Sequence, residues 1–309
     1  MILGAHLGVA HGLAKAVDDL KAIHGDALQI FSKSPQMWAG PPIALEAAEA
    51  FRTAVRERGV RATAVHHGYL ANLGSPKKFT LVQSRKALRD EIARAELLGV
   101  DGLIFHPGAH MGSGVDAGLR TIAESLTGAI EEQPEAKSRL LLENAAGQGT
   151  ALGSTFEELK TVLDLVNRPD RLGVAIDTCH LFASGVDFRT DETYGRVIDH
   201  LGSTLGLATV RAFHLNDAKA ELGSHRDRHE NIGKGQIGLE GFRHFLTDPA
   251  WAEVPGYLET PLDDKTYARY AEDLETLRSL VPALEGTAAA VTAPPTPARR
   301  RHSSKARAS

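Results

Sequence analysis

The chain has 309 residues, of which 42% are hydrophobic and 24% charged, which is an ordinary composition for a soluble globular protein. Its one cysteine, Cys179, excludes an intrachain disulfide, and no apolar run approaches the roughly 20 residues of a membrane span. The first residues, MILGAHLG, lack the charged and apolar regions of a signal peptide, so we expect a cytoplasmic protein.

The net charge of −4 is unevenly distributed along the chain. No acidic residue follows Glu285. The basic residues beyond it are Arg299, Arg300, Arg301, Lys305 and Arg307. Without these five the chain has 30 basic and 39 acidic residues, a net charge of −9. Such a surface repels nucleic acid, so DNA binding would need positive charge that this count does not contain.

Strand-like and helix-like segments alternate from the first residue to about residue 280. The predicted strands are residues 2–6, 27–31, 62–66, 102–105, 139–142, 173–176, 210–213 and 256–258. The predicted helices are 13–23, 43–58, 76–98, 118–132, 155–166, 192–205, 239–245 and 265–279. Gly59 and Gly99 end the second and third helices, Ser154 is the expected N-cap of the fifth, and a loop covers 216–238.

Eight consecutive strand–helix units predict a parallel sheet closed into a TIM barrel. A doubly wound open sheet is the alternative, although it more often has five or six strands. We expect one barrel domain over residues 1–285 and a disordered basic tail over 286–309, which is rich in Ala, Pro, Thr and Arg. The basic residues of this tail either add lesion-independent affinity for DNA phosphates or are solvated and inert.

Residues that bind metals follow the predicted strands, where a β/α barrel places its active site. They are His66, His106, Glu143, Asp177, His180, His214, Asp227, His229 and Glu259. A single histidine at a strand end is more often structural, but solvation does not easily explain His, Asp or Glu at six consecutive strand ends. Imidazole and carboxylate ligands suit zinc, with manganese and iron as competitors. A mononuclear site needs three or four protein ligands, so nine candidates imply more than one ion.

Metal ions would also change the local charge of this cleft. Four carboxylates contribute about −4, whereas three divalent ions contribute about +6. A filled site is therefore locally positive within an acidic protein, which makes a phosphodiester substrate electrostatically reasonable.

Nine segments of the chain resemble the endonuclease IV family of abasic-site endonucleases. They are GAHLG (4–8), FSKSPQMW (31–38), HHGYLANLG (66–74), FHPGAH (105–110), ENAAGQG (143–149), IDTCHLFASGVD (176–187), FHLNDAK (213–219), DRHENIGKG (227–235) and ETP (259–261). The combination of IDTCH, HLNDAK and DRH is the most specific part of this resemblance, which runs from residue 4 to about residue 280.

The resemblance implies a barrel that holds three zinc ions. On the family pattern His66, His106 and Glu143 hold the first ion. Glu143 bridges to the second, which Asp177, His214 and Glu259 complete. His180, Asp227 and His229 hold the third. The implied activity is hydrolysis of the phosphodiester on the 5′ side of an abasic site in duplex DNA, which leaves a 3′-hydroxyl and a 5′ deoxyribose phosphate. Glu143 then has a catalytic role, because it orients or deprotonates the nucleophile.

The resemblance also implies three DNA contacts. Tyr69 matches a family tyrosine that probes the DNA, Gln36 stands where the family often has an arginine that enters the duplex, and Trp38 lies close to it. Packing explains Tyr69 and Trp38 about as well. A second departure is His67, where many members have an aspartate.

Other residues of these motifs have less specific interpretations. Lys33 and Lys219 are candidate phosphate contacts, although exposed lysines are usually only solvated. Cys179 is expected to be a buried spacer between two ligands, and we expect a monomer.

Two other functions fit part of this pattern. A metal-dependent sugar isomerase or epimerase also gathers His, Asp and Glu at strand ends, but a two-metal isomerase would not need His180, Asp227 and His229. A metal-stabilised DNA-binding protein without catalysis is the other possibility. Structural zinc sites are usually closed and rich in cysteine, and this chain has one cysteine.

Overall fold

The computed structural model describes residues 1–263 and 266–282, in which eight parallel strands form a closed barrel. The strands neighbour one another in the order β1–β10–β7–β6–β5–β4–β3–β2. They are β1 (Ile2–Leu7), β2 (Ala27–Phe31), β3 (Ala62–His66), β4 (Gly102–Phe105), β5 (Arg139–Glu143), β6 (Leu172–Asp177), β7 (Val210–His214) and β10 (Pro255–Leu258). β1 pairs with both β2 and β10, so the TIM barrel is confirmed and the open sheet is wrong.

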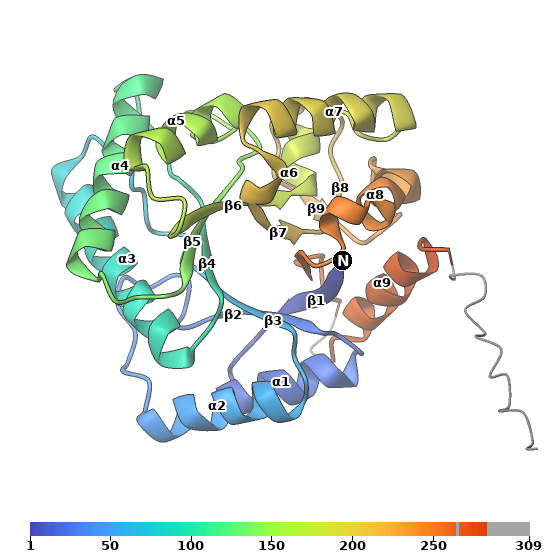
Figure 1. Ribbon diagram of the computed structural model, residues 1–309, viewed down its shortest axis with the longest axis horizontal. Coiled ribbons are helices and arrows are strands. Elements are labelled where there is room, and N and C mark those ends of the chain that lie inside the picture. Colours follow the sequence, from blue (N-terminus) through green and yellow to red (C-terminus); the bar gives the residue numbers. More distant parts are fainter. Residues whose placement is uncertain (264–265, 283–309) are drawn as a thin grey trace, which may run out of the picture.

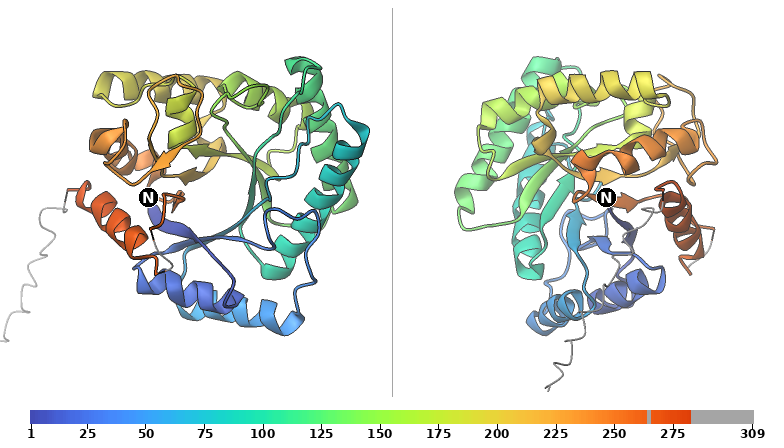
Figure 2. Two further views of the ribbon diagram at one scale, coloured as in Figure 1. Left: turned by 180° about the vertical axis from the view of Figure 1, so that it is seen from behind. Right: turned by 45° about the vertical axis from the view of Figure 1, so that its right-hand side comes forward.

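Helices lie around the outside of the strands, as the views from the two ends show (Figure 1 and Figure 2). They are α1 (Leu13–Ala22), α2 (Leu45–Glu57), α3 (Lys78–Leu98), α4 (Val115–Glu132), α5 (Phe156–Val166), α6 (Thr178–Ala183), α7 (Asp191–Thr204), α8 (Gly238–Thr247) and α9 (Ala268–Ser279). Short 3₁₀ turns at Leu207–Thr209 and Pro249–Trp251 precede β7 and β10. Each crossover returns the chain to the same end of the barrel, so all strands point in one direction.

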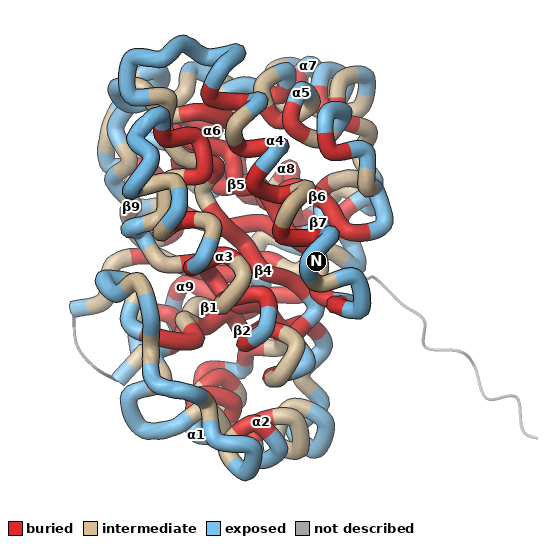
Figure 3. Tube along the Cα trace, turned by 90° about the vertical axis from the view of Figure 1, so that its left-hand side faces the viewer, coloured by how far each residue is buried: buried red, intermediate tan, exposed pale blue. Residues whose placement is uncertain are grey.

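Consecutive residues of the barrel strands are buried, so both faces of these strands are covered (Figure 3). This explains why the strand sequences are continuous apolar runs and do not alternate between apolar and polar residues. The larger apolar core fills the space between the strands and the helices. A separate, smaller apolar cluster lies inside the barrel and includes Ala64, Leu141, Ala212 and Tyr257. The strands therefore act as a rigid wall with packed side chains on both sides, and their ends are fixed in position.

The structure corrects several local predictions. The N-cap of α5 is Thr155 and not Ser154, because the Thr155 hydroxyl accepts a hydrogen bond from the Glu158 N–H. Helix α4 begins at Val115, three residues before the predicted start at Gly118. Gly118 lies inside this helix, where a Cβ atom would be 2.6 Å from Leu152 Cδ1. The predicted boundary is wrong because Gly118 is needed for close packing against Leu152 and does not mark the start of the helix.

Several short elements were not predicted. Helix α6 directly follows β6, and the loop predicted over 216–238 contains an antiparallel pair, β8 (Asp217–Ala218) and β9 (His229–Glu230). The predicted tail over 286–309 lies outside the described residues, as does residue 265, the predicted start of the last helix. Within the part of the chain that is described, no helix is long and apolar enough to cross a membrane.

The close backbone approach of β1 to β2 gives a test of this packing. A Cβ atom added at Gly4 in β1 would lie 1.6 Å from the carbonyl oxygen of Ala27 in β2. We expect Gly4→Ala to lower the free energy of unfolding by at least about 3 kcal/mol, because backbone cannot rotate away as a side chain can. Gly195→Ala in α7 is the control, since its Cβ would meet open space and alanine stabilises a helix by about 0.5–1 kcal/mol. Equal unfolding curves for the two variants would contradict the packing of β1 against β2.

Candidate metal centre

The nine predicted ligand residues converge at the carboxyl end of the barrel. Four of them end strands: His66 in β3, Glu143 in β5, Asp177 in β6 and His214 in β7. His106 and Glu259 are the first residues after β4 and β10, and His180 lies in α6. Asp227 and His229 enter from the segment that ends in β9. Residues that are up to 193 positions apart in the sequence, His66 and Glu259, therefore share one site.

The donor atoms of these residues form three compact groups, each with its atoms within 4.8 Å of one another. The groups are His66–His106–Glu143, Glu143–Asp177–His214–Glu259 and His180–Asp227–His229. These groups coincide with the three ligand sets that the family resemblance implies. Two overlapping sets also satisfy the same distance, His66–His214–Glu259 and Asp177–Cys179–His229, which reflects how closely the groups are packed.

Glu143 joins the first two groups because its two carboxylate oxygens face different neighbours. Oε2 lies 3.0 Å from His66 Nε2 and 3.5 Å from His106 Nδ1. Oε1 lies 2.9 Å from His214 Nδ1 and 3.4 Å from His180 Nδ1. This fully buried side chain is thus placed as a bridge.

Burial and charge act in opposite directions on the pKa values of this cluster. Burial alone would raise the pKa of Glu143, but the neighbouring His106 and His214 outweigh it and hold the pKa well below its usual range. Burial would lower the pKa of His214, yet the carboxylates of Glu259 and Glu143 raise it to about 9. Burial likewise opposes ionisation of Asp227, but His180 brings its pKa down to about 2. The carboxylates are therefore ionised at neutral pH and favour cations between them.

The hydrogen bonds of the histidines prepare them as ligands. His66 Nδ1 donates to the carbonyl of His67 at 2.8 Å, and His229 Nδ1 donates to the carbonyl of Glu259 at 3.1 Å. His180 Nδ1 donates to the carbonyl of Asn144 at 3.0 Å. In the neutral form of each ring, these bonds leave Nε2 as the atom with a free electron pair.

Two of these nitrogens lie where a cation would bind. His180 Nε2 and His229 Nε2 are buried and have no hydrogen-bond partner within the described residues. Each lies 3.3 Å from an oxygen of Asp227. Buried polar atoms are normally satisfied, and a cation between two imidazoles and a carboxylate would satisfy all three. The residues present therefore fit a divalent metal.

A basic cavity adjoins the third donor group. It has a volume of about 610 Å³ and is lined by Gln148, Lys219, Ala220, His225, Arg226, Asp227 and Arg228. Arg226 and Arg228 are exposed, and Asp227 belongs to both the cavity and the donor group. Positive side chains thus lie directly beside the candidate metal centre.

The comparisons with known proteins agree with this geometry. Residues 17–280 match the family described as xylose isomerase-like TIM barrel. The chain is 40% identical over 282 residues to "Probable endonuclease 4" of Chloroflexus aurantiacus, which covers 91% of this chain and 99% of that protein. The corresponding protein of Trichlorobacter lovleyi is 41% identical and covers 90% of this chain and 99% of its own length. Endonuclease IV from Thermus thermophilus superposes with a TM-score of 0.80 at 33% identity, covering 91% of this chain and 98% of that one.

The chain belongs to the endonuclease IV family. Sugar epimerases share only the fold with it: 3-keto-D-glucoside 4-epimerase from E. coli has a TM-score of 0.65 at 14% identity, with 90% of this chain and 99% of that one covered. The sequence resemblance to endonuclease IV is thereby confirmed.

Sequence reasoning missed two residues that hold the endonuclease IV site together. Gln29, in the middle of β2, donates from Nε2 to Glu259 Oε1 at 2.7 Å and accepts from His214 Nε2 at 2.9 Å. His6 Nδ1 lies 2.7 Å from the same Glu259 oxygen. His6 lies near the end of β1, so the strand-end rule could have found it. Gln29 carries no such signal.

Two asparagines fix the position of Asp177. Asn216 Nδ2 donates to Asp177 Oδ2 at 2.7 Å, and Asn144 Oδ1 accepts from the Asp177 N–H at 2.6 Å. Both residues directly follow or lie close to a ligand in the motifs ENAAGQG and FHLNDAK. Their side chains fasten β5, β6 and the segment after β7 together at the carboxyl end of the barrel.

The predicted DNA contacts lie on two adjacent loops. Tyr69 is 62% exposed, and its ring packs edge-on against Phe31 at a centroid distance of 5.5 Å. Its N–H donates to the carbonyl of Pro35 at 3.0 Å, which joins its loop to the segment that contains Gln36 and Trp38. Gln36 is exposed and Trp38 half-buried. Their contacts with DNA stay predictions.

The structure corrects the interpretation of Lys33. Its ammonium group is buried and forms ion pairs with Glu91 and with Asp90 of α3, the latter at 2.9 Å. A lysine held in this way cannot contact phosphate, so the prediction for Lys33 is wrong. Lys219 is exposed and lies 3.5 Å from Glu230, a pairing that leaves its predicted phosphate contact open.

His67 and Cys179, two further residues of these motifs, are both buried. His67 is buried, and its Nδ1 donates to the carbonyl of Gly68 at 3.0 Å. Cys179 is buried as predicted, and burial raises the pKa of its thiol to about 12. The thiol is therefore neutral at physiological pH, although Sγ lies among the donor atoms of Asp177 and His229.

The two hydrogen bonds of Gln29 generate a test of the metal centre. Gln29→Leu keeps the approximate volume but leaves His214 Nε2 and Glu259 Oε1 without this partner. We expect zinc affinity, measured by competition with a chromogenic chelator, to fall by about 10–100-fold, the usual effect of removing an outer hydrogen bond. Gln133→Leu is the control, because Gln133 Nε2 donates to the carbonyl of Arg89, far from the site. Equal zinc release by both variants would show that Gln29 does not support the ligands.

Proposed function

We propose that this chain is a zinc-dependent DNA-repair endonuclease of the base excision pathway. It hydrolyses the phosphodiester on the 5′ side of an abasic site in duplex DNA and leaves a 3′-hydroxyl and a 5′ deoxyribose phosphate. We further propose that it holds three zinc ions and acts as a cytoplasmic monomer. The names of its relatives, "Probable endonuclease 4", support the nuclease activity.

The third donor group carries this proposal. His180, Asp227 and His229 form a set of their own beside the pair of groups that Glu143 joins. A barrel that isomerises a small sugar with one or two metals has no use for a third site. A phosphodiester has two bridging and two non-bridging oxygens at phosphorus, so an additional cation has charge to neutralise there.

The residues of the site have separate roles in this chemistry. Zinc ions bound in the three groups would lower the pKa of a water and neutralise phosphate charge. Glu143 is ionised and buried, so one of its carboxylate oxygens can accept a hydrogen bond from a water and orient it, or take its proton. The Asp177 side chain is fully buried, whereas those of His106 and Asp227 are 37% and 39% exposed. The substrate therefore reaches the site from the side of His106 and Asp227.

DNA binding requires positive charge on this side of an acidic protein. Lys219, Arg226 and Arg228 supply it around the cavity beside Asp227. We propose that they contact backbone phosphates, and that Tyr69, Gln36 and Trp38 contact the duplex from the opposite loops. Gln36 is shorter and uncharged compared with arginine, so it would stabilise a distorted duplex less.

The function is tested with a duplex that contains one tetrahydrofuran abasic analogue, which cannot break by β-elimination. We expect a single nick on its 5′ side, with a 3′-hydroxyl that a DNA polymerase extends. A chelator should abolish nicking, and added zinc should restore it.

The matched undamaged duplex and free aldoses are the controls and should stay unchanged. Isomerisation of an aldose without nicking of the abasic duplex would favour a sugar isomerase, the alternative function on this fold. Binding of the abasic duplex without either reaction would indicate a DNA-binding protein that uses its metals structurally.

Glu143→Gln tests the bridging carboxylate. The amide has nearly the same shape but cannot accept a proton as a carboxylate does, so we expect turnover to fall by at least about 100-fold. The thermal unfolding midpoint and the affinity for abasic DNA should change little. Elemental analysis should return three zinc ions for the unmodified protein and shows how many the variant retains. Glu46→Gln is the control, because Glu46 is exposed on α2. Turnover close to that of the control would mean that another residue holds the nucleophile.

A further inference from the structure

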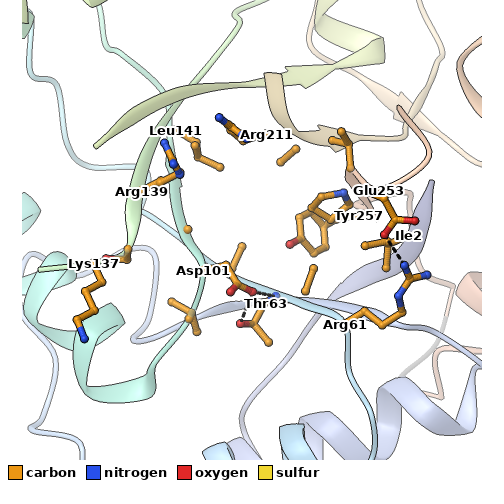
Figure 4. A pocket seen from close by; sticks show the side chains of 18 of the residues that line it. Ile2, Arg61, Thr63, Asp101, Lys137, Arg139, Leu141, Arg211, Glu253 and Tyr257 are labelled. Carbon is orange, nitrogen blue, oxygen red and sulfur yellow. Dashed lines mark hydrogen bonds and ion pairs between the residues drawn. The ribbon is translucent and has the colours of Figure 1, made fainter. Parts of the chain in front are cut away.

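The amino end of the barrel contains a second large cavity, which the proposed function does not use. Its volume is about 700 Å³, and its lining comes from β1, β3, β4, β5, β7 and β10 (Figure 4). It is closed toward the metal centre by the apolar cluster inside the barrel, which includes Ile104 and Leu141. Cavities of roughly 300–1,000 Å³ are the size that holds small molecules.

The cavity exists because small residues face the barrel axis at this end. Ala62, Ala64 and Gly102 line it where larger side chains would close the barrel. On β6, Gly173 leaves room for two lining side chains: a Cβ atom there would lie 2.8 Å from Arg211 Cγ and 2.9 Å from Leu141 Cδ2. The absence of a side chain at Gly173 leaves the space that the Arg211 stem occupies.

A β-bulge turns Arg211 toward this space. Val174 pairs with Val210 and Ala175 pairs with Ala212, so Arg211 has no Cα partner on β6. Val210 packs into the outer core and Ala212 into the cluster inside the barrel, which leaves the extra residue between them at the mouth. Bulges of this kind redirect a side chain and often lie next to binding sites.

The positive charges of the cavity are less well paired than its negative charges. Glu253 forms an ion pair with Arg61 at 2.7 Å, and Asp101 accepts hydrogen bonds from the N–H and hydroxyl of Thr63. A third carboxylate, that of Glu96, accepts from the Ser138 N–H at 2.7 Å.

The cations on the opposite side of the cavity have fewer partners. Arg139 donates one hydrogen bond, to the carbonyl of Pro169. The side chains of Arg211 and Lys137 have no ion pair or hydrogen bond within the described residues. Burial lowers the pKa of Arg211, and the nearby Arg139 lowers it further. Figure 4 shows the side chains of Arg139 and Arg211 on the same side of the cavity.

The hydroxyl groups of Ser138 and Tyr257 complete the lining. Ser138 is buried, and its Oγ has no hydrogen-bond partner within the described part of the chain. The Tyr257 ring lies inside the cavity, and Figure 4 shows its hydroxyl directed toward the centre. Burial raises the pKa of Tyr257, which keeps this hydroxyl a neutral donor. The Tyr257 hydroxyl is therefore placed to donate to a ligand in the cavity.

We propose that the amino end of the barrel is a binding site for a small phosphate monoester, such as a nucleotide. Arg139 and Arg211 hold the phosphate from neighbouring sides, since a planar guanidinium matches phosphate oxygens with two hydrogen bonds. The Tyr257 hydroxyl donates to the same ligand inside the cavity. This site is independent of the proposed nuclease activity.

The experiment titrates AMP into the zinc-loaded protein by calorimetry at low ionic strength, with adenosine as the ligand that lacks phosphate. We expect saturable binding of one AMP per chain and none of adenosine. Arg211→Ala should weaken AMP binding by about tenfold or more, because one charge-assisted contact is lost. The matched variant is Arg228→Ala, which removes an exposed arginine from the cavity at the metal end. It should bind AMP like the unmodified protein.

Each other outcome overturns the proposal. Weakening by Arg228→Ala and not by Arg211→Ala would place the nucleotide at the metal centre. If adenosine bound as tightly as AMP, the phosphate group would not contribute to binding. A titration of AMP without saturation would show that the cavity does not bind a phosphate monoester. Nicking of abasic DNA is measured for both variants and should be unaffected by Arg211→Ala, so failure here leaves the proposed nuclease function intact.

Discussion

A buried carboxylate needs positive charge or hydrogen-bond donors around it, and Glu143 is surrounded by four imidazole rings. His66, His106, His180 and His214 all place a nitrogen within 3.5 Å of its oxygens. An ionised carboxylate without such partners costs several kcal/mol in an environment of low polarity. His66 and His214 end β3 and β7, His106 follows β4 and His180 lies in α6, so the charge of Glu143 is compatible only with a barrel that is closed and correctly registered. The same arrangement that stabilises the carboxylate creates the ligand positions around it.

The polar residues around this centre limit how far it can relax. Gln29 contacts one ligand on β7 and one after β10, and Asn216 contacts Asp177 while its Oδ1 accepts from the Glu259 N–H at 2.8 Å. These amides connect opposite sides of the barrel mouth through hydrogen bonds that carry no charge. Because an amide cannot ionise, it holds the carboxylates in place without competing for the cations between them. The fold thus separates two tasks: charged groups are the candidate ligands, and neutral groups orient them.

Most of the barrel and six of the nine candidate ligands could be predicted because strand ends in a parallel barrel meet at one edge; His180, Asp227 and His229 lie in the segments that follow β6 and β7. His, Asp and Glu residues that follow predicted strands are therefore expected to lie close together in the folded barrel. The failures depend on tertiary contacts: Lys33 looks exposed in FSKSPQMW, yet its partner Glu91 lies 58 residues away in α3. Helix α6 was missed because it is buried on all sides, so no apolar period marks it. Asp177 caps this helix by accepting a hydrogen bond from the His180 N–H, and it also belongs to the second donor group. The residues of this segment are therefore chosen for the site, and their hydrophobic pattern does not indicate a helix.

The charge distribution explains how an acidic protein can bind a polyanion. A count of −9 for the chain without its last five basic residues suggests repulsion everywhere. The structure places cations unevenly instead, with Lys219, Arg226 and Arg228 around the cavity beside Asp227. At the short range of a phosphate contact these charges dominate, because salt screens the more distant acidic residues beyond about 8–10 Å. The acidic remainder then disfavours nonspecific association over the rest of the surface. The acidic net charge disfavours DNA over most of the surface, and the proposed phosphate contacts coincide with the cations beside Asp227.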